Sequence, residues 1–147
     1  MNTTETRVQF GGVTPVLRVS DVAVSLDYYT RVLGFASPWR APGFACVRRG
    51  ECSLFLCEGD QGHAGGWVWI AVGDADRLHD EFRAAGAFIR QPPTNYPWGS
   101  RELHVADPDG NVLRLASDRT PGEPDGEWLD MYGRRWGRDA QGNRKPL

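Results

Sequence analysis

The 147-residue sequence contains little that would direct it to a membrane or to nucleic acid. No apolar run approaches the roughly 18–20 residues that a membrane-spanning helix needs. Residues 1–10 lack the basic and then apolar profile of a signal peptide. The 17 basic and 19 acidic side chains leave a net charge of −2, without the basic excess of duplex-binding domains. We therefore expect no membrane partner and no nucleic-acid partner.

Cysteine is also scarce, and its pattern bears on the cellular compartment. The three cysteines, Cys46, Cys52 and Cys57, are an odd number and form no C-x-x-C pair. Free thiols of this kind fit a reducing environment better than a disulfide framework. The sequence therefore favours a cytoplasmic protein.

Tryptophan, in contrast, is abundant. The chain contains six Trp and four Tyr, which is more indole than a core of this size requires. Each buried Trp also carries an N–H group that must find a hydrogen-bond acceptor. We expect some of these Trp side chains to line a cavity or an interface.

An internal repeat divides the chain into two similar modules. Residues 19–35 align without a gap on residues 72–88. In each copy an apolar strand ends at an Asp in an N-cap position, and a helix of about ten residues follows and stops near Gly34 or Gly86. Short extended segments follow each helix, and Pro108 lies in an Asp-Pro-Asp-Gly hairpin turn between the last two. Each copy thus reads β-α-β-β-β.

The repeat predicts an α+β fold with five consecutive parts. These are an N-terminal extension (residues 1–12), a first βαβββ module (13–60), a glycine-rich linker (61–66), a second βαβββ module (67–117) and a C-terminal tail (118–147). In the tail, residues 127–136 interleave aromatic and charged side chains, whereas residues 137–147 are polar and are expected to fray. The tail is expected to clamp onto the body through Trp128 and Trp136 or to reach a neighbouring subunit; a disordered end is the alternative.

Strand alternation predicts which side chains face a common groove. Successive side chains of a strand point to opposite faces, so the aliphatic ones pack under the helices and the others face the concave side. The predicted concave side chains are Arg18, Phe55, Trp67, Trp69, Glu102, His104 and Arg114. An aromatic wall with few polar groups is typical of a small-molecule site. The alternative for Trp67 and Trp69 is that they only fill the centre of a barrel.

Two stretches of sequence resemble a known superfamily. They are TPVLRVSD (residues 14–21) with YYTRVLGF (28–35), and YPWGSRELHVADPDGN (96–111). They resemble the vicinal oxygen chelate superfamily, which includes glyoxalases, extradiol dioxygenases, and fosfomycin- and bleomycin-resistance proteins. The second stretch is most similar to the bleomycin-resistance branch, as is Trp67-Val68-Trp69. The resemblance covers residues 13–117 and implies two curled mixed sheets with helices outside, paired in a homodimer whose N-terminal strand is often exchanged.

The resemblance also places the metal ligands of the enzymatic members on this sequence. They fall on Thr14, Ser53, Trp67 and Arg114, none of which is a carboxylate or an imidazole. A guanidinium has no lone pair to offer, and a metal site needs three or four converging donors. We therefore expect no metal and no cofactor. Glu102 and His104 form the only inward pair able to bind a metal, and a polar contact explains them better than coordination.

In bleomycin-binding relatives, a Trp between Pro and Gly and a Phe before the third strand enclose the planar rings of the drug. Trp98 and Phe44 occupy the matching positions, and Trp39, Tyr96 and Trp69 are placed to extend the platform. A loop anchor is the alternative role of Trp98. Those relatives are strongly acidic, whereas this chain has a net charge of −2, so a smaller planar ligand that is neutral or anionic fits at least as well. The resemblance thus implies an antibiotic-resistance type of binding protein that sequesters a planar aromatic molecule, with no catalytic residue.

Two enzymatic alternatives remain open from the sequence. The first is a metal-dependent enzyme of the glyoxalase or dioxygenase type. The second is a metal-free acid–base enzyme that uses His104 with Glu102, since proton transfer requires only a His that titrates near neutral pH.

Overall fold

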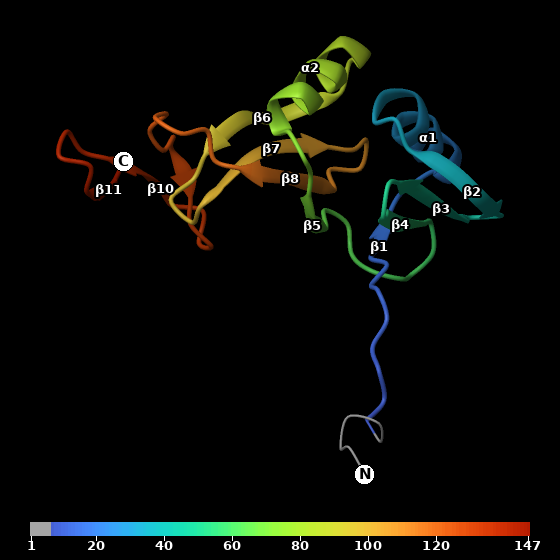
Figure 1. Ribbon diagram of the computed structural model, residues 1–147. Coiled ribbons are helices and arrows are strands. Elements are labelled where there is room, and N and C mark those ends of the chain that lie inside the picture. Colours follow the sequence, from blue (N-terminus) through green and yellow to red (C-terminus); the bar gives the residue numbers. More distant parts are fainter. Residues whose placement is uncertain (1–6) are drawn as a thin grey trace.

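The computed structural model describes residues 7–147, and its first module is a four-stranded mixed sheet with one helical segment (Figure 1). The elements are β1 (Val16–Arg18), α1 (Val22–Asp27), a π-helical turn η2 (Tyr28–Val32), β2 (Ala36–Ala41), β3 (Phe44–Arg49) and β4 (Cys52–Cys57), in the sheet order β1-β4-β3-β2. Strand β1 is parallel to β4, and the other pairs are antiparallel. The Asp21 carboxylate caps α1 by accepting the N–H groups of Ala23 and Val24.

The second module repeats this plan. Its elements are β5 (Trp67–Ala71), α2 (Ala75–Ala85), β6 (Phe88–Asn95), β7 (Ser100–Ala106) and β8 (Val112–Asp118), in the order β5-β8-β7-β6. Asp74 caps the start of α2, and Gly86 ends it with a φ of 84°, which only glycine adopts without strain. The predicted α+β architecture of two βαβββ modules is therefore confirmed.

The two modules share one hydrophobic core, with α1 and α2 on the same side of the sheets (Figure 1). Tyr28 connects them directly, since its hydroxyl donates to the Ala106 carbonyl (2.7 Å) and accepts the Phe88 N–H (2.9 Å). An ion pair between Arg49 and Glu81 (2.6 Å) joins β3 to α2. These contacts fix one module against the other.

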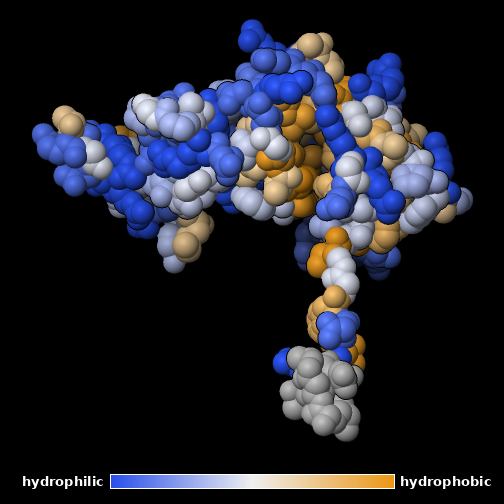
Figure 2. Space-filling model, in the orientation of Figure 1, coloured by the Kyte–Doolittle hydropathy of each residue, from blue (hydrophilic) through white to orange (hydrophobic). Residues whose placement is uncertain are grey.

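Figure 2 shows apolar surface gathered in a hollow below α2, while most of the remaining visible surface is polar. Within residues 7–147, no helix is long and apolar enough to cross a membrane.

The C-terminal segment forms a small sheet of its own. Strands β9 (Trp128–Leu129), β10 (Arg135–Arg138) and β11 (Arg144–Pro146) pair in the antiparallel order β11-β10-β9, at the end of the molecule away from the first module (Figure 1). The expected fraying of residues 137–147 is wrong, because these residues complete β10 and form β11. The alternative of a disordered end is wrong for the same reason.

Asn95 and Arg101 dock this C-terminal segment on the second module. Asn95 is wholly buried, and its amide nitrogen donates to the carbonyls of Thr120 (2.9 Å) and Glu123 (3.0 Å). Its side-chain oxygen accepts the Thr120 N–H (3.1 Å) and a guanidinium N–H of Arg101 (3.2 Å). Arg101 also pairs with Glu123 and with Asp76 on α2. The segment is therefore held by a polar network centred on two buried side chains, Asn95 and Arg101.

Candidate functional site

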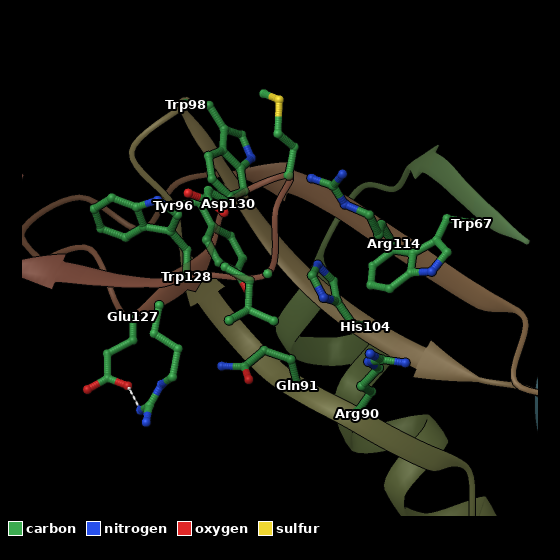
Figure 3. A pocket seen from close by; sticks show the side chains of 14 residues that line it. Trp67, Arg90, Gln91, Tyr96, Trp98, His104, Arg114, Glu127, Trp128 and Asp130 are labelled. Carbon is green, nitrogen blue, oxygen red and sulfur yellow. Dashed lines mark hydrogen bonds and ion pairs between the residues drawn. The ribbon is translucent and has the colours of Figure 1, made fainter. Parts of the chain in front are cut away.

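A cavity of about 1120 Å³ lies between the concave face of the second sheet and the C-terminal segment (Figure 3). The sheet side includes Trp67, Arg90, Trp98, His104 and Arg114, and the opposite side includes Trp128, Leu129, Met131 and Arg135. Small-molecule sites commonly enclose about 300–1,000 Å³. The cavity is therefore large enough for a drug-sized ligand.

Glu102 organises the floor of this cavity. Its side chain is wholly buried, and its two oxygens accept five hydrogen bonds. The donors are Trp98 Nε1 (2.6 Å), Ser100 Oγ (2.6 Å), His104 Nε2 (2.9 Å), Arg114 Nε (2.9 Å) and Arg114 Nη2 (3.1 Å). An ionised carboxylate offers about four lone-pair sites. All of the acceptor capacity of Glu102 is therefore in use.

This environment keeps Glu102 ionised. Burial acts to raise its pKa, but the hydrogen bonds from His104, Arg114, Ser100 and Trp98 outweigh burial and hold the pKa far below its usual value. Protonation would replace one acceptor site by a donor and remove the charge that attracts Arg114. Glu102 thus acts as a fixed anion that positions its neighbours.

Tyr96 lies at the centre of a ladder of three rings. Its ring is stacked on Trp98 at 4.6 Å between centroids and on His104 at 5.7 Å, with interplanar angles of 7° and 8°. Burial, followed by the negative charge of Glu102, raises the pKa of Tyr96 to about 12, so its phenol is neutral. Tyr96 is 3% exposed, whereas Trp98 is 49% exposed. The ladder therefore offers a rigidly backed indole to the cavity.

Trp67 and Trp69 both lie on the concave face and are about half exposed. Trp67 meets His104 edge-on (6.1 Å between centroids), and the Arg90 guanidinium lies 4.9 Å from the Trp67 ring centroid. Trp69 lies with Trp98 in an adjoining hollow. Within this chain, neither Trp serves only as filling for a closed barrel.

The first module holds a separate aromatic group. Trp39 is stacked on Phe44 (5.8 Å between centroids, interplanar angle 8°), and Phe55 lies 5.5 Å from Trp39 and 5.2 Å from Phe44. None of the three lines the cavity of the second module. A single chain therefore does not bring Phe44 opposite Trp98. The aromatic side chains that were expected to line one groove form two separate groups, one in each module.

Arg18 also lies apart from the cavity. Its guanidinium donates to the carbonyls of Gln61 and Gly62, at 3.1 Å in each case. The Arg18 carbonyl in turn accepts the side-chain amide of Asn111 (2.9 Å). Within one chain, Arg18 is therefore not part of the wall of this cavity, because its side chain holds the linker.

The metal positions of the enzymatic relatives do not fit a divalent ion here. Arg114 donates two hydrogen bonds to Glu102 and has no lone pair, and the Trp67 indole offers no suitable donor. The Ser53 hydroxyl contacts the Cys46 thiol at 3.5 Å. Among residues 7–147, no three His, Cys, Asp or Glu side chains are grouped to hold a metal.

A family model, described as "Glyoxalase/Bleomycin resistance protein/Dioxygenase superfamily", matches residues 11–115. The chain belongs to this superfamily. The match ends before the C-terminal segment, so β9–β11 lie outside the matched residues. No curated protein matches the chain.

Several solved structures share this fold. The bleomycin-binding protein of Streptomyces verticillus, solved with copper(II)-bleomycin, is 30% identical with a TM-score of 0.67, covering 77% of this chain and all of that chain. TioX from Micromonospora is 26% identical with a TM-score of 0.64, covering 74% and 100%. A glyoxalase/bleomycin resistance protein/dioxygenase from Nocardioides is 22% identical with a TM-score of 0.63, covering 84% and 93%.

Several residues that line the cavity were not predicted from the sequence. Arg90 and Gln91 lie on β6, whose alternation is interrupted by irregular pairing with β7. Met131 and its neighbours come from the C-terminal segment. An Asp-x-x-Gly pattern at residues 130–133 was a usable signal for the hairpin that carries them.

Proposed function

We propose that this protein binds and sequesters a planar aromatic ligand without a metal ion, as a binding protein of the bleomycin-resistance type. The observation that carries the proposal is the half-exposed ring of Trp98, backed by Tyr96 and fixed by its hydrogen bond to Glu102. A pre-positioned ring binds a flat ligand without the cost of ordering a side chain. The likeness to the bleomycin-binding protein of Streptomyces verticillus supports the proposal.

The polar chemistry of the cavity favours binding over acid–base catalysis. Glu102 has no free acceptor site, and His104 is held between Glu102 and the Tyr96 ring. Arg114 stands where a metal ligand would be needed. These side chains orient a ligand, and we assign none of them a catalytic role.

A homodimer is part of the proposal. Trp39 and Trp98 are each nearly half exposed in different modules of one chain. In the proposed dimer, Phe44 of one chain lies opposite Trp98 of the other. The N-terminal extension also exposes Val8 (87%) and Phe10 (96%), which exchange onto a partner would cover. The three thiols, none of them in a disulfide, support a cytoplasmic location.

The test is a fluorescence titration with the uncharged dye N-phenyl-1-naphthylamine. Trp98→Ala should weaken dye binding by about tenfold or more, because it removes the stacking surface. Trp98→Phe, the matched control, keeps a ring in place and should change the dissociation constant by only about twofold to threefold. An unchanged dissociation constant for Trp98→Ala, with a melting temperature within a few degrees of the wild type, would refute the proposal.

A further inference from the structure

Half of the residues that line the cavity come from outside the superfamily match. They are Glu127, Trp128, Leu129, Asp130, Met131, Gly133 and Arg135. Glu127 directly precedes β9, and the others lie on β9, on β10 or at the turn between them; we call residues 127–138 the β9–β10 hairpin. Figure 3 shows this part of the chain across the cavity from His104 and Arg114. The hairpin therefore forms a second wall of the cavity, built from residues outside the matched range.

The hairpin is a preformed wall. Asp130 Oδ1 accepts the N–H groups of Tyr132 and Arg134, each at 2.9 Å. Asp130 Oδ2 accepts Arg134 Nε (2.7 Å) and Trp136 Nε1 (3.0 Å). Together with the docking through Asn95, these bonds fix the hairpin before any ligand arrives, which reduces the entropy lost on binding.

The charges of this wall are internally compensated. Asp130 pairs with Arg134 (2.7 Å), and Arg135 pairs with Glu127 (2.5 Å). Leu129 and Met131 remain as apolar side chains that line the cavity and are 57% and 89% exposed. The hairpin thus offers apolar and polarisable contact surface but no free charge.

The sheet side carries one uncompensated charge. Arg114 is paired with Glu102 (2.9 Å). Arg90 has no carboxylate partner within residues 7–147, and its guanidinium lies over the Trp67 ring at 4.9 Å. Figure 3 shows Arg90 and Trp98 on opposite sides of the cavity. A ligand stacked near Trp98 therefore faces a cation at the other end of the cavity.

We propose that the cavity takes a planar aromatic anion, such as an aromatic sulfonate or carboxylate, between the sheet and the β9–β10 hairpin. The anionic group of the ligand lies toward Arg90, and its rings lie on the Trp98 side. Leu129 and Met131 contact the ligand from the hairpin side. This inference rests on the proposed function, since it names the ligand class of the same site and adds the hairpin to it.

The charge is tested with two dyes that share one ring system. The first is 8-anilinonaphthalene-1-sulfonate, and the second, N-phenyl-1-naphthylamine, lacks the sulfonate. Arg90→Gln should weaken binding of the sulfonate by about fivefold or more and change binding of the neutral dye by less than about twofold. Arg83→Gln, an exposed site on α2, is the matched control for net charge and should leave both dissociation constants unchanged. Equal weakening of both dyes by Arg90→Gln, or no effect on either, would overturn the assignment of an anion.

The hairpin is tested with the double variant Leu129→Ser and Met131→Ser. Both side chains are mostly exposed, so the melting temperature should move little. Both dyes should bind about fivefold more weakly, because the variant removes an apolar wall. Tyr132→Ser is the control, since Tyr132 is exposed on the same turn and does not line the cavity.

The outcomes separate the inference from the proposed function. If Trp98→Ala weakens binding of both dyes but the Arg90 and hairpin variants do not, the binding site at Trp98 is supported. The anionic ligand and the role of the hairpin are then rejected. If Trp98→Ala leaves both dyes unchanged, the proposed function falls, and the inference falls with it. Weakening by all three variants, with their separate dye dependence, supports both.

Discussion

At the scale of single residues, one buried carboxylate determines the shape of the site. Glu102 takes hydrogen bonds from Trp98 in a loop, from Ser100 and His104 on its own strand, and from Arg114 on β8. A buried charge is costly unless it is fully paired, and the Glu102 carboxylate is fully paired. The orientation of Trp98 is therefore tied to the position of the Glu102 carboxylate.

The Glu102 network makes stability depend on pH. The folded pKa of Glu102 is far below the unfolded value of about 4.3, so its stabilising contribution is complete above that value and is lost as the pH falls toward the folded pKa. We expect the gap in unfolding free energy between the wild type and Glu102→Gln to shrink by about 1–2 kcal/mol between pH 6 and pH 3. Denaturant unfolding at several pH values measures this gap.

Glu51→Gln is the control for this prediction, because Glu51 is exposed. Its gap from the wild type should stay small. A wild-type to Glu102→Gln gap that is the same at pH 3 and pH 6 would contradict the prediction.

At the scale of elements, three hairpin turns share one pattern of sequence and hydrogen bonds. They are residues 107–111, 130–134 and 139–143, each beginning Asp-x-x-Gly. In each turn the Asp N–H donates to the carbonyl of the fifth residue at 2.9 Å, and the glycine has a φ of 78–83°. Each Asp Oδ1 also accepts the N–H groups of the third and fifth residues.

Only one of these three turns was predicted from the sequence. The turn at Asp107 was predicted because long alternating strands flank it, whereas β9 and β10 are too short to show a period. Alternation also placed Trp67, Glu102 and His104 on one face, since the direction of a side chain along a strand is a local property. The docking of the C-terminal segment by Asn95 depends on contacts distant in sequence, which no local pattern encodes.

Asn95 offers a test of that docking. Asn95→Ala removes four hydrogen bonds and leaves buried groups without partners, at a cost of about 1–3 kcal/mol. We expect amide hydrogen exchange over residues 120–126 to accelerate by about tenfold or more, with a lower melting temperature. Asn143→Ala, at an exposed turn, should leave this segment unchanged. Unaltered exchange in Asn95→Ala would show that the segment is held by other contacts.

At the scale of the whole molecule, one chain combines a continuous core with unusually exposed aromatic surface. Tyr28 ties the modules together, while Trp39, Trp67, Trp69 and Trp98 remain about half exposed on the concave faces. Half-exposed aromatic rings on both modules are the surface that the proposed dimer would cover.

Sedimentation velocity at micromolar concentration should therefore show a species of twice the 16.3 kDa of one chain. Phe10→Ser should shift the equilibrium toward the monomer, because Phe10 is an exposed apolar side chain of the N-terminal extension. Gln9→Ser, its exposed neighbour, should not. A monomer as the sole wild-type species at these concentrations would contradict the dimer.

The hairpin tip has a consequence for how such a protein diversifies. The backbone of the turn is specified by Asp130 and Gly133, and the side chain of Met131 takes no part in packing. Selection can therefore exchange Met131 for other residues without endangering the fold. Binding of a new ligand would then be tuned first at this tip, while the sheet face, held by its buried carboxylate, stays the same.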